Sequence, residues 1–218
     1  MKLQLALDDI RLIDALVLGQ KVRDHVDIFE IGSPLIIEEG MRAVREFRKY
    51  FPEKEILADT KIVDAGAYEA ELAFKAGADY CTVIAITDHL TIKECIKSAE
   101  HYRKKVFVDT INTQNITESV PQLEELGVDH ISVHVGVDEQ AVGKTPLSAL
   151  KEVKQISKQS IVSVAGGINV DTIEQYIALK ADVVIVGGGI NHADDPVATA
   201  QILAKKIHKK NFLNRGSI

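Results

Sequence analysis

The sequence contains few cysteines and no long hydrophobic segment. Only two of its 218 residues are cysteines, Cys81 and Cys95, and their spacing matches no common metal-binding motif. Cys81 lies in an apolar run and Cys95 in a helical pattern, so we interpret both as small buried residues rather than as a disulfide. There is no apolar run of about 18 residues, which a membrane-spanning helix needs, and no signal-peptide core at the N-terminus. These absences favour a cytoplasmic protein without a membrane partner.

A strong charge of one sign is also missing. The formal net charge is −6, and acidic and basic residues are mixed along most of the chain. This pattern argues against nucleic acid as a partner. Small anionic ligands stay possible, because local groups hold them. Basic residues gather only in the last helical pattern and the tail, where they complement the helix dipole.

No linker or low-complexity segment divides the sequence. We therefore predict a single domain over residues 1–210 and a C-terminal tail over residues 211–218. Short apolar runs alternate with longer amphipathic segments, which predicts a parallel sheet with helices between its strands. Eight units of about 27 residues favour an α/β fold of the closed (β/α)8 TIM barrel type over an open doubly wound sheet. The predicted strands are 3–8, 26–31, 56–61, 80–86, 106–109, 130–135, 161–165 and 182–187.

Charged residues stand at or near the carboxyl ends of the predicted strands. In a barrel these ends meet on the face that carries active sites. An unpaired ionised group there costs several kcal/mol, so the charges must neutralise one another, bind a cation or meet a substrate. The residues in question are Asp8, Glu30, Asp59, Lys61, Asp109 and His134.

The segment "DTKIVD", residues 59–64, carries the strongest of these signals. Side chains alternate along a strand, so Asp59 and Lys61 share one face, where a charged pair is costly unless it has a function. A purely structural ion pair is the alternative. Glu30 lies inside the apolar segment "DIFEIG", which indicates burial with a partner. Taken singly, Asp8 would more often cap a helix and His134 would more often be structural.

Two glycine-rich segments follow the seventh and eighth predicted strands, "SVAGGIN" and "VIVGGGINHADDP". Glycines let backbone N–H groups approach an anion, and the helix that follows adds a favourable dipole. These two loops form the usual phosphate site of TIM barrels. Tight turns are the alternative explanation for the glycines. Neither loop contains Lys or Arg, so the backbone would bind most of the anion.

Together these features indicate a phosphorylated substrate whose reactive end meets the charged cluster. Carboxylate oxygens suit Mg²⁺, and Glu30 and Asp59 are the predicted ligands. A cation beside Lys61 would stabilise an enediolate, and a neutral His134 could move a proton. Such chemistry serves aldol, decarboxylation and isomerisation reactions of sugar phosphates.

The segments "ALD", "EIG", "DTKIVDAG" and "AGGI…VGGGI" resemble the orotidine-monophosphate decarboxylase suprafamily over about residues 1–210. Within it the chain is most similar to the 3-hexulose-6-phosphate synthases, and next to the 3-keto-L-gulonate-6-phosphate decarboxylases. The resemblance implies a TIM barrel, homodimers with shared active sites, and Mg²⁺ as cofactor. It implies a lyase of the ribulose monophosphate pathway that condenses D-ribulose 5-phosphate with formaldehyde to D-arabino-3-hexulose 6-phosphate.

The resemblance also implies roles for individual residues. Glu30 and Asp59 would ligate Mg²⁺, while Asp8 and Lys61 would lie at the reacting end of the substrate. Asp64 would reach into the neighbouring subunit's site. The remaining residues are His134 for proton transfer and Gly167, Gly188 and Gly189 for the phosphate.

Several other functions stay open. The decarboxylase branch has an arginine three residues after the sixth-strand histidine, where this chain has Val137, and another arginine in its last phosphate loop, where this chain reads "VGGGI". Orotidine-monophosphate decarboxylase also expects an arginine in that loop. A ribulose-phosphate epimerase would need two histidines and two aspartates around its metal, and the strand ends do not supply them. A phosphosugar sensor without activity would not need the charged cluster.

Overall fold

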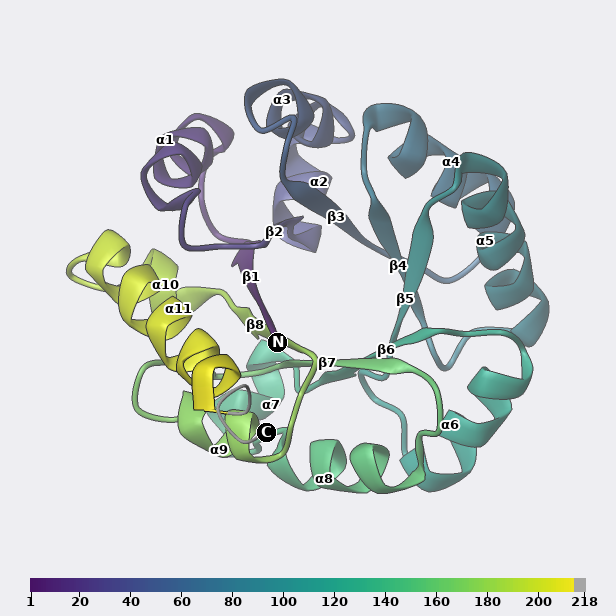
Figure 1. The fold of residues 1–218 in the computed structure, drawn as a ribbon. Helices are drawn as coiled ribbons and strands as arrows, with labels where there is room; N and C mark the ends of the chain where they lie inside the picture. Colours follow the sequence, from purple (N-terminus) through teal and green to yellow (C-terminus); the bar gives the residue numbers. More distant parts are fainter. Residues whose placement is uncertain (214–218) are drawn as a thin grey trace.

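The computed structural model describes residues 1–213 and shows eight parallel strands that pair in sequence order and close into a barrel (Figure 1). Each predicted strand overlaps the observed strand of the same rank, which confirms the TIM barrel and excludes the open sheet. The strands are β1 (Lys2–Leu7), β2 (Ile28–Ile31), β3 (Glu55–Ile62), β4 (Tyr80–Ile84), β5 (Lys105–Asp109), β6 (His130–His134), β7 (Ile161–Ala165) and β8 (Val183–Val186).

Helices form a ring outside the strands (Figure 1). Two of the connections between strands hold a second helix, and two helices follow the last strand, so the ring is more divided than a plain strand–helix alternation predicts. The helices are α1 (Leu12–Val22), α2 (Ser33–Glu39), α3 (Arg42–Tyr50), α4 (Gly66–Ala76), α5 (His89–Tyr102), α6 (Ile116–Glu125), α7 (Val137–Ala141), α8 (Leu147–Ile156), α9 (Ile173–Ala178), α10 (Gly188–Asn191) and α11 (Pro196–Leu213). Within the described residues, no helix has the length and apolar character needed to cross a membrane.

The first and last strands meet where the barrel closes. β1 pairs with β8, and α11 packs against α1 and β1. Helix α11 continues to Leu213, past the predicted domain end at residue 210. The rest of the predicted tail, 214–218, lies outside the described residues.

Alternation along the strands separates two apolar layers. Leu3, Leu5 and Leu7 point out of the barrel and pack under the helices in the main core. A smaller cluster fills the barrel interior and consists of Ala6, Ile28, Leu57, Phe107, Val183 and Ile185. Towards the amino ends of the strands, the Phe107 ring stacks on His130 with centroids 4.8 Å apart. This packing closes the lower half of the barrel and leaves the carboxyl ends free to form a site.

Candidate active site

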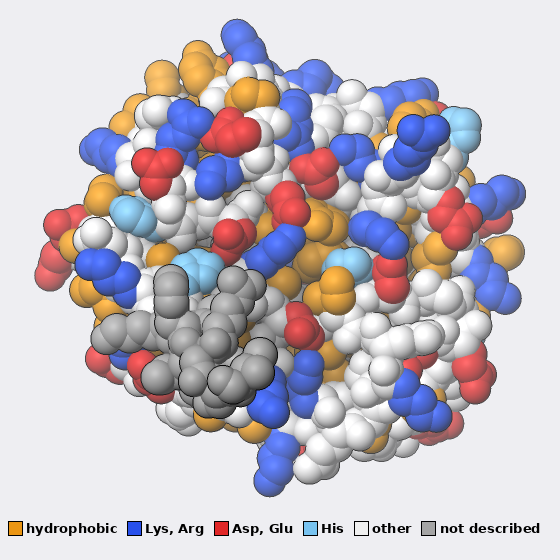
Figure 2. Space-filling model, viewed as in Figure 1, with side chains coloured by type: hydrophobic (Ala, Val, Ile, Leu, Met, Phe, Trp, Pro, Cys, Tyr) orange, Lys and Arg blue, Asp and Glu red, His pale blue; other side chains and the backbone are white. Residues whose placement is uncertain are grey.

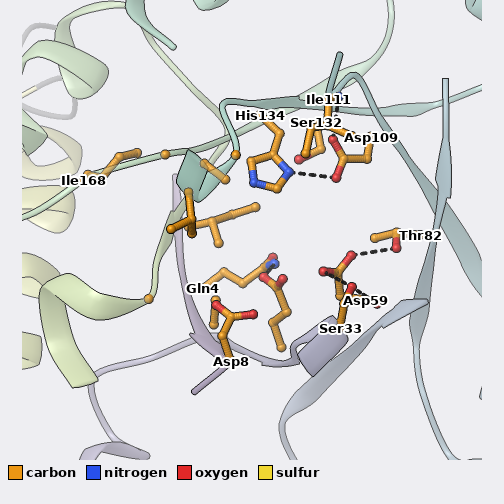
Figure 3. A pocket seen from close by; sticks show the side chains of 18 of the residues that line it. Gln4, Asp8, Ser33, Asp59, Thr82, Asp109, Ile111, Ser132, His134 and Ile168 are labelled. Atoms are coloured by element: carbon orange, nitrogen blue, oxygen red, sulfur yellow. Dashed lines mark hydrogen bonds and ion pairs between the residues drawn. The ribbon is translucent and has the colours of Figure 1, made fainter. Parts of the chain in front are cut away.

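A cavity of about 510 Å³ opens at the carboxyl ends of the strands. Figure 3 shows side chains from several strands pointing into it, and Figure 2 shows acidic, basic and histidine side chains close together on the face of the barrel. The cavity brings together every predicted site residue except Asp64. Those residues are Asp8, Glu30, Asp59, Lys61, His134, Gly167, Gly188 and Gly189.

Asp59 is held as an anion by three donors from three elements. Lys61 forms an ion pair with Oδ2, which also accepts a hydrogen bond of 2.9 Å from the Ser33 hydroxyl. The Thr82 hydroxyl donates to Oδ1 at 2.8 Å. Burial raises the pKa of Asp59, but the charge of Lys61 and these hydrogen bonds outweigh burial and leave the pKa lowered. Asp59 is therefore ionised and fixed in one orientation.

Lys61 sits at an irregularity in β3. The pairing of β3 with β4 shifts between Ala58 and Ile62, and Lys61 has a φ of 45°, in the left-handed region that a side chain rarely adopts. The backbone N–H of Lys61 donates to the Thr82 hydroxyl at 2.8 Å, which helps to hold this conformation. Strained backbone of this kind concentrates at functional sites. The irregularity lets Lys61 keep an ammonium in the cavity beside Asp59.

The ammonium of Lys61 stays charged although it is largely buried. Burial lowers its pKa, but the carboxylates of Asp59 and then Asp109 outweigh this effect and leave the pKa raised. Its Nζ lies 3.9 Å from the Asp109 carboxylate. Lys61 thus carries a permanent positive charge that faces the cavity.

Negative charge nonetheless exceeds positive charge around Lys61. Burial raises the pKa of Glu30 well above its ordinary value, and the nearby carboxylates of Asp59 and Asp8 raise it further. The pKa of Asp8 is raised by burial and by Asp59. A cation in this space would relieve the repulsion among the three carboxylates.

The donor set fits Mg²⁺ better than a metal that requires a complete protein cage. Glu30 and Asp59 offer hard oxygen ligands, and the buried Oε1 of Gln4 beside them has no hydrogen-bond partner. Within residues 1–213, no three histidine, cysteine or carboxylate side chains come close enough to enclose a metal. Mg²⁺ usually takes one or two protein carboxylates and completes its shell with water and substrate oxygens. Glu30 and Asp59 therefore could hold Mg²⁺.

His134 is oriented by Asp109, a pairing that sequence reasoning did not predict. Nδ1 of His134 lies 2.8 Å from Oδ2 of Asp109, whose other oxygen accepts a hydrogen bond of 2.9 Å from the N–H of Ile111. Burial of the ring lowers the pKa of His134, but the hydrogen bond and charge of Asp109 outweigh burial and leave the pKa raised. With Nδ1 engaged, Nε2 is the nitrogen left for a substrate (Figure 3).

Gly167, Gly188 and Gly189 of the two glycine loops also line the cavity, but the structure requires glycine at each of them for a different reason. A Cβ on Gly189 would lie 2.4 Å from the carbonyl oxygen of Ile168, so close packing of the two loops excludes any side chain there. Gly167 has a φ of 64°, which also favours glycine. A Cβ on Gly188 would meet only the His192 side chain, at 3.3 Å. Tight packing thus explains Gly189 and the positive φ explains Gly167, whereas an open approach to a ligand explains Gly188 better.

Sequence reasoning missed the neutral side chains that support the site. Gln4, Ser33 and Thr82 all line the cavity and contact the carboxylates. Gln4 shares a strand face with Asp8, so the period of two was the signal that could have found it. Ser33 and Thr82 give no such signal, because hydroxyl side chains are common at strand ends and helix starts.

The sequence that builds this site matches a known family. The family described as "Orotidine 5'-phosphate decarboxylase / HUMPS family" matches residues 1–203. The chain belongs to this family.

Relatives within the family fall into two branches. A 3-hexulose-6-phosphate synthase of Bacillus subtilis (strain 168) is 44% identical over 207 residues, which cover 95% of this chain and 99% of that protein. The crystal structure of 3-hexulose-6-phosphate synthase from Salmonella typhimurium superposes with a TM-score of 0.95 at 44% identity, covering 96% of this chain and 99% of that one. The structure of 3-keto-L-gulonate-6-phosphate decarboxylase from Vibrio cholerae O1 biovar El Tor has a TM-score of 0.83 at 28% identity, with 95% and 97% covered. This member of the family is a lyase enzyme on the side of the synthases.

Asp64 is the one predicted site residue that does not line the cavity of its own chain. Its side chain is exposed and accepts a hydrogen bond of 2.7 Å from the N–H of Ala65 at the start of α4. Asp64 does not line the cavity of its own barrel, and its predicted role in a neighbouring subunit's site stays a prediction.

Proposed function

We propose that the chain condenses D-ribulose 5-phosphate with formaldehyde to give D-arabino-3-hexulose 6-phosphate. The observation that carries this proposal is the pairing of a complete carboxylate, lysine and histidine cluster with Val137 at the cavity wall. Val137 is 79% exposed and stands where the decarboxylase branch is expected to carry an arginine. The 44% identity to proteins named for the synthase reaction supports the same choice.

In this proposal the chain's own residues remove a proton and stabilise the charge that forms. Nε2 of His134 takes a proton from C1 of the ketose, and the charge that develops on the C2 oxygen is met by the ammonium of Lys61. Mg²⁺, which Glu30 and Asp59 would hold, supplies Lewis-acid polarisation of the ketose oxygens. C1 of the enediolate then forms a bond to the carbon of formaldehyde. The formaldehyde oxygen accepts a proton from the His134 imidazolium, so atoms and charges balance.

The glycine loops would hold the phosphate at the other end of the substrate. Within the described residues that line the cavity, Lys61 is the one lysine or arginine, and it lies with the carboxylates rather than with the glycines. Backbone N–H groups near Gly167, Gly188 and Gly189 would therefore provide most of the phosphate contacts.

An activity assay distinguishes this proposal from the decarboxylase alternative. Purified protein with Mg²⁺ should consume formaldehyde when D-ribulose 5-phosphate is present, and EDTA should stop the reaction. Release of CO₂ from 3-keto-L-gulonate 6-phosphate without loss of formaldehyde would assign the chain to the decarboxylase branch. Binding of the phosphosugar with neither activity would indicate a non-catalytic sensor.

The pH profile should report the Asp109–His134 pair. His134 must be neutral to act as a base, so kcat/KM should rise with pH through its pKa, which lies above the ordinary value of 6.5. Asp109→Asn removes the group that raises this pKa and leaves burial, which lowers it. The acid limb should therefore move to lower pH, and the plateau should fall by about 10- to 100-fold because the ring loses its orientation.

Asp129→Asn is a matched control for this experiment. Asp129 contacts His130 Nδ1 at the same 2.8 Å, but this pair lies at the opposite end of β6, outside the cavity. The acid limb of the pH profile of Asp129→Asn should therefore match that of the wild type. If the acid limb of the kcat/KM profile is not shifted in Asp109→Asn, His134 is not the base.

We propose further that two copies associate through the face formed by α4 and α5. Among the described residues, five large apolar side chains of this face are 41–65% exposed, and the Thr87 hydroxyl joins its two loops by donating to the carbonyl of Val63. A second copy would cover this apolar surface and bring Asp64, which lies beside it, to the partner's cavity. The exposed residues are Val63, Tyr68, Leu72, Ile86 and Leu90.

The two buried free cysteines agree with a cytoplasmic location.

Shared sites predict complementation between two inactive variants. Lys61→Ala damages the site in its own barrel, and Asp64→Asn damages the site of its partner. A mixed dimer keeps one intact site, so unfolding, mixing and refolding the two variants should restore roughly a quarter of wild-type activity. The control mixes the two folded variants without unfolding them, so that subunits do not exchange. If the mixed dimers form by light scattering but recover no activity, Asp64 serves the site of its own barrel and not that of the partner.

A further inference from the structure

Gln4 is a polar residue in an apolar part of the barrel. It lies on β1, has no exposed surface, and pairs with Ile28 on one side and Ile185 on the other. Each polar group left without a hydrogen bond in such a place costs about 1–3 kcal/mol. A leucine or methionine would fill the same volume without that cost.

Only half of the Gln4 amide is satisfied by the protein. Nε2 donates to Oε2 of Glu30 at 2.6 Å, a charge-assisted hydrogen bond between two strands. Oε1 of Gln4 is buried and has no partner among the described residues. Since the amide nitrogen faces the carboxylate, Gln4 is suited to hold an ionised Glu30.

The hydrogen bond from Gln4 engages one oxygen of the Glu30 carboxylate and leaves the other without a hydrogen bond. Oε2 accepts the hydrogen bond from Gln4, and within residues 1–213 no hydrogen bond reaches Oε1. Glu30 itself is only 8% exposed and lines the cavity. The hydrogen bond from Gln4 thus fixes the orientation of the Glu30 carboxylate, and Oε1 is available to a ligand in the cavity.

We propose that Gln4 is a positioning residue that orients the Glu30 carboxylate for a divalent cation. The inference rests on the proposed function, since it requires the cation site formed by Glu30 and Asp59. Hydrogen-bonded neighbours of metal-binding carboxylates fix their direction, and losing such a neighbour typically weakens metal affinity 10- to 100-fold. Gln4 acts through Glu30 and does not touch the reacting atoms.

Mn²⁺ binding to the full chain tests this inference without relying on activity. The metal-free protein is titrated with Mn²⁺ and followed by electron paramagnetic resonance, and each variant is also melted in EDTA. Gln4→Met keeps the volume but removes the donor, so its Mn²⁺ dissociation constant should rise about 10- to 100-fold. Its melting temperature should change little, because the loss of the unpaired amide oxygen of Gln4 stabilises the protein and the loss of the donor to Oε2 of Glu30 destabilises it. Gln4→Leu serves the same purpose if Gln4→Met does not fold.

Gln140→Met is the matched control. Gln140 also lines the cavity, but its Nε2 donates to the carbonyl of Val135 at 2.8 Å, away from the carboxylates. Its Mn²⁺ affinity should equal that of the wild type. Wild-type Mn²⁺ affinity in folded Gln4→Met, whatever its melting temperature, would reduce Gln4 to a structural residue and overturn the inference alone. Failure of the wild type to bind Mn²⁺, or unchanged binding in Glu30→Gln, would overturn the proposed cation site as well.

Discussion

Lys61→Met should lower kcat by about 10³-fold or more, because the charge that forms on the substrate loses the one lysine or arginine among the described residues that line the cavity. A loss of this size corresponds to about 4 kcal/mol of transition-state stabilisation. The substitution also removes the partner of a buried carboxylate, Asp59. KM should change much less than kcat, since the phosphate contacts come from the glycine loops.

Lys104→Met separates this effect from the loss of an ion pair in general. Lys104 binds Asp79 at 2.7 Å, and its side chain is 30% exposed, against 27% for Lys61. Both variants lose a partly buried pair, but only Lys61 lies in the cavity. Steady-state kinetics with circular dichroism of both proteins make the comparison. Retention of more than a tenth of wild-type kcat in folded Lys61→Met would contradict the proposed role.

Glu30→Gln should abolish activity and yet stabilise the metal-free protein. Burial and the neighbouring carboxylates raise the pKa of Glu30 well above its ordinary value of 4.5. Between 4.5 and the raised pKa the native state binds more protons than the unfolded state, so stability falls as pH rises through this window. A neutral glutamine removes that cost and can still accept the hydrogen bond from Nε2 of Gln4.

Two measurements check this prediction. In EDTA near neutral pH, the melting temperature of Glu30→Gln should exceed that of the wild type by about 2–4 °C for each kcal/mol gained. Mn²⁺ affinity should fall by at least about 100-fold, because Glu30 is a proposed ligand of the metal, whereas Gln4 acts only through Glu30. Glu55→Gln is the control, since Glu55 pairs with Lys2 at the amino end of β3 and should keep wild-type affinity. A lower melting temperature with unchanged affinity would mean that Glu30 has only a structural role.

Strand periodicity predicted most of the fold and the positions of the charged residues. A period of two set Asp8, Glu30 and Asp59 on the inner face, and parallel pairing of eight strands brings their carboxyl ends to one cavity. The left-handed backbone at Lys61 was not predictable, because nothing in the residue types around it signals a shift in pairing.

Contacts between strands and contacts between subunits lie beyond what the sequence alone can show. The hydrogen bond from His134 to Asp109 joins β5 to β6, and only the register of these strands decides that the two side chains meet. The support that Thr82 gives to Asp59 depends on register in the same way. Asp64 is exposed and does not line the cavity of its own barrel, so the proposed role in a partner's site can be tested only with two chains.

Proton exchange at C1 of D-ribulose 5-phosphate tests the central claim most directly. The enzyme is incubated with the ketose and Mg²⁺ in deuterium oxide, without formaldehyde, and the C1 protons are followed by nuclear magnetic resonance. If His134 and Lys61 generate an enediolate, one C1 proton should exchange with the wild type, and exchange should slow at least about 100-fold in His134→Asn and Lys61→Met. Added formaldehyde should then convert the ketose to the hexulose phosphate. Exchange at the wild-type rate in His134→Asn, or none with a wild type that consumes formaldehyde, would contradict the proposed site.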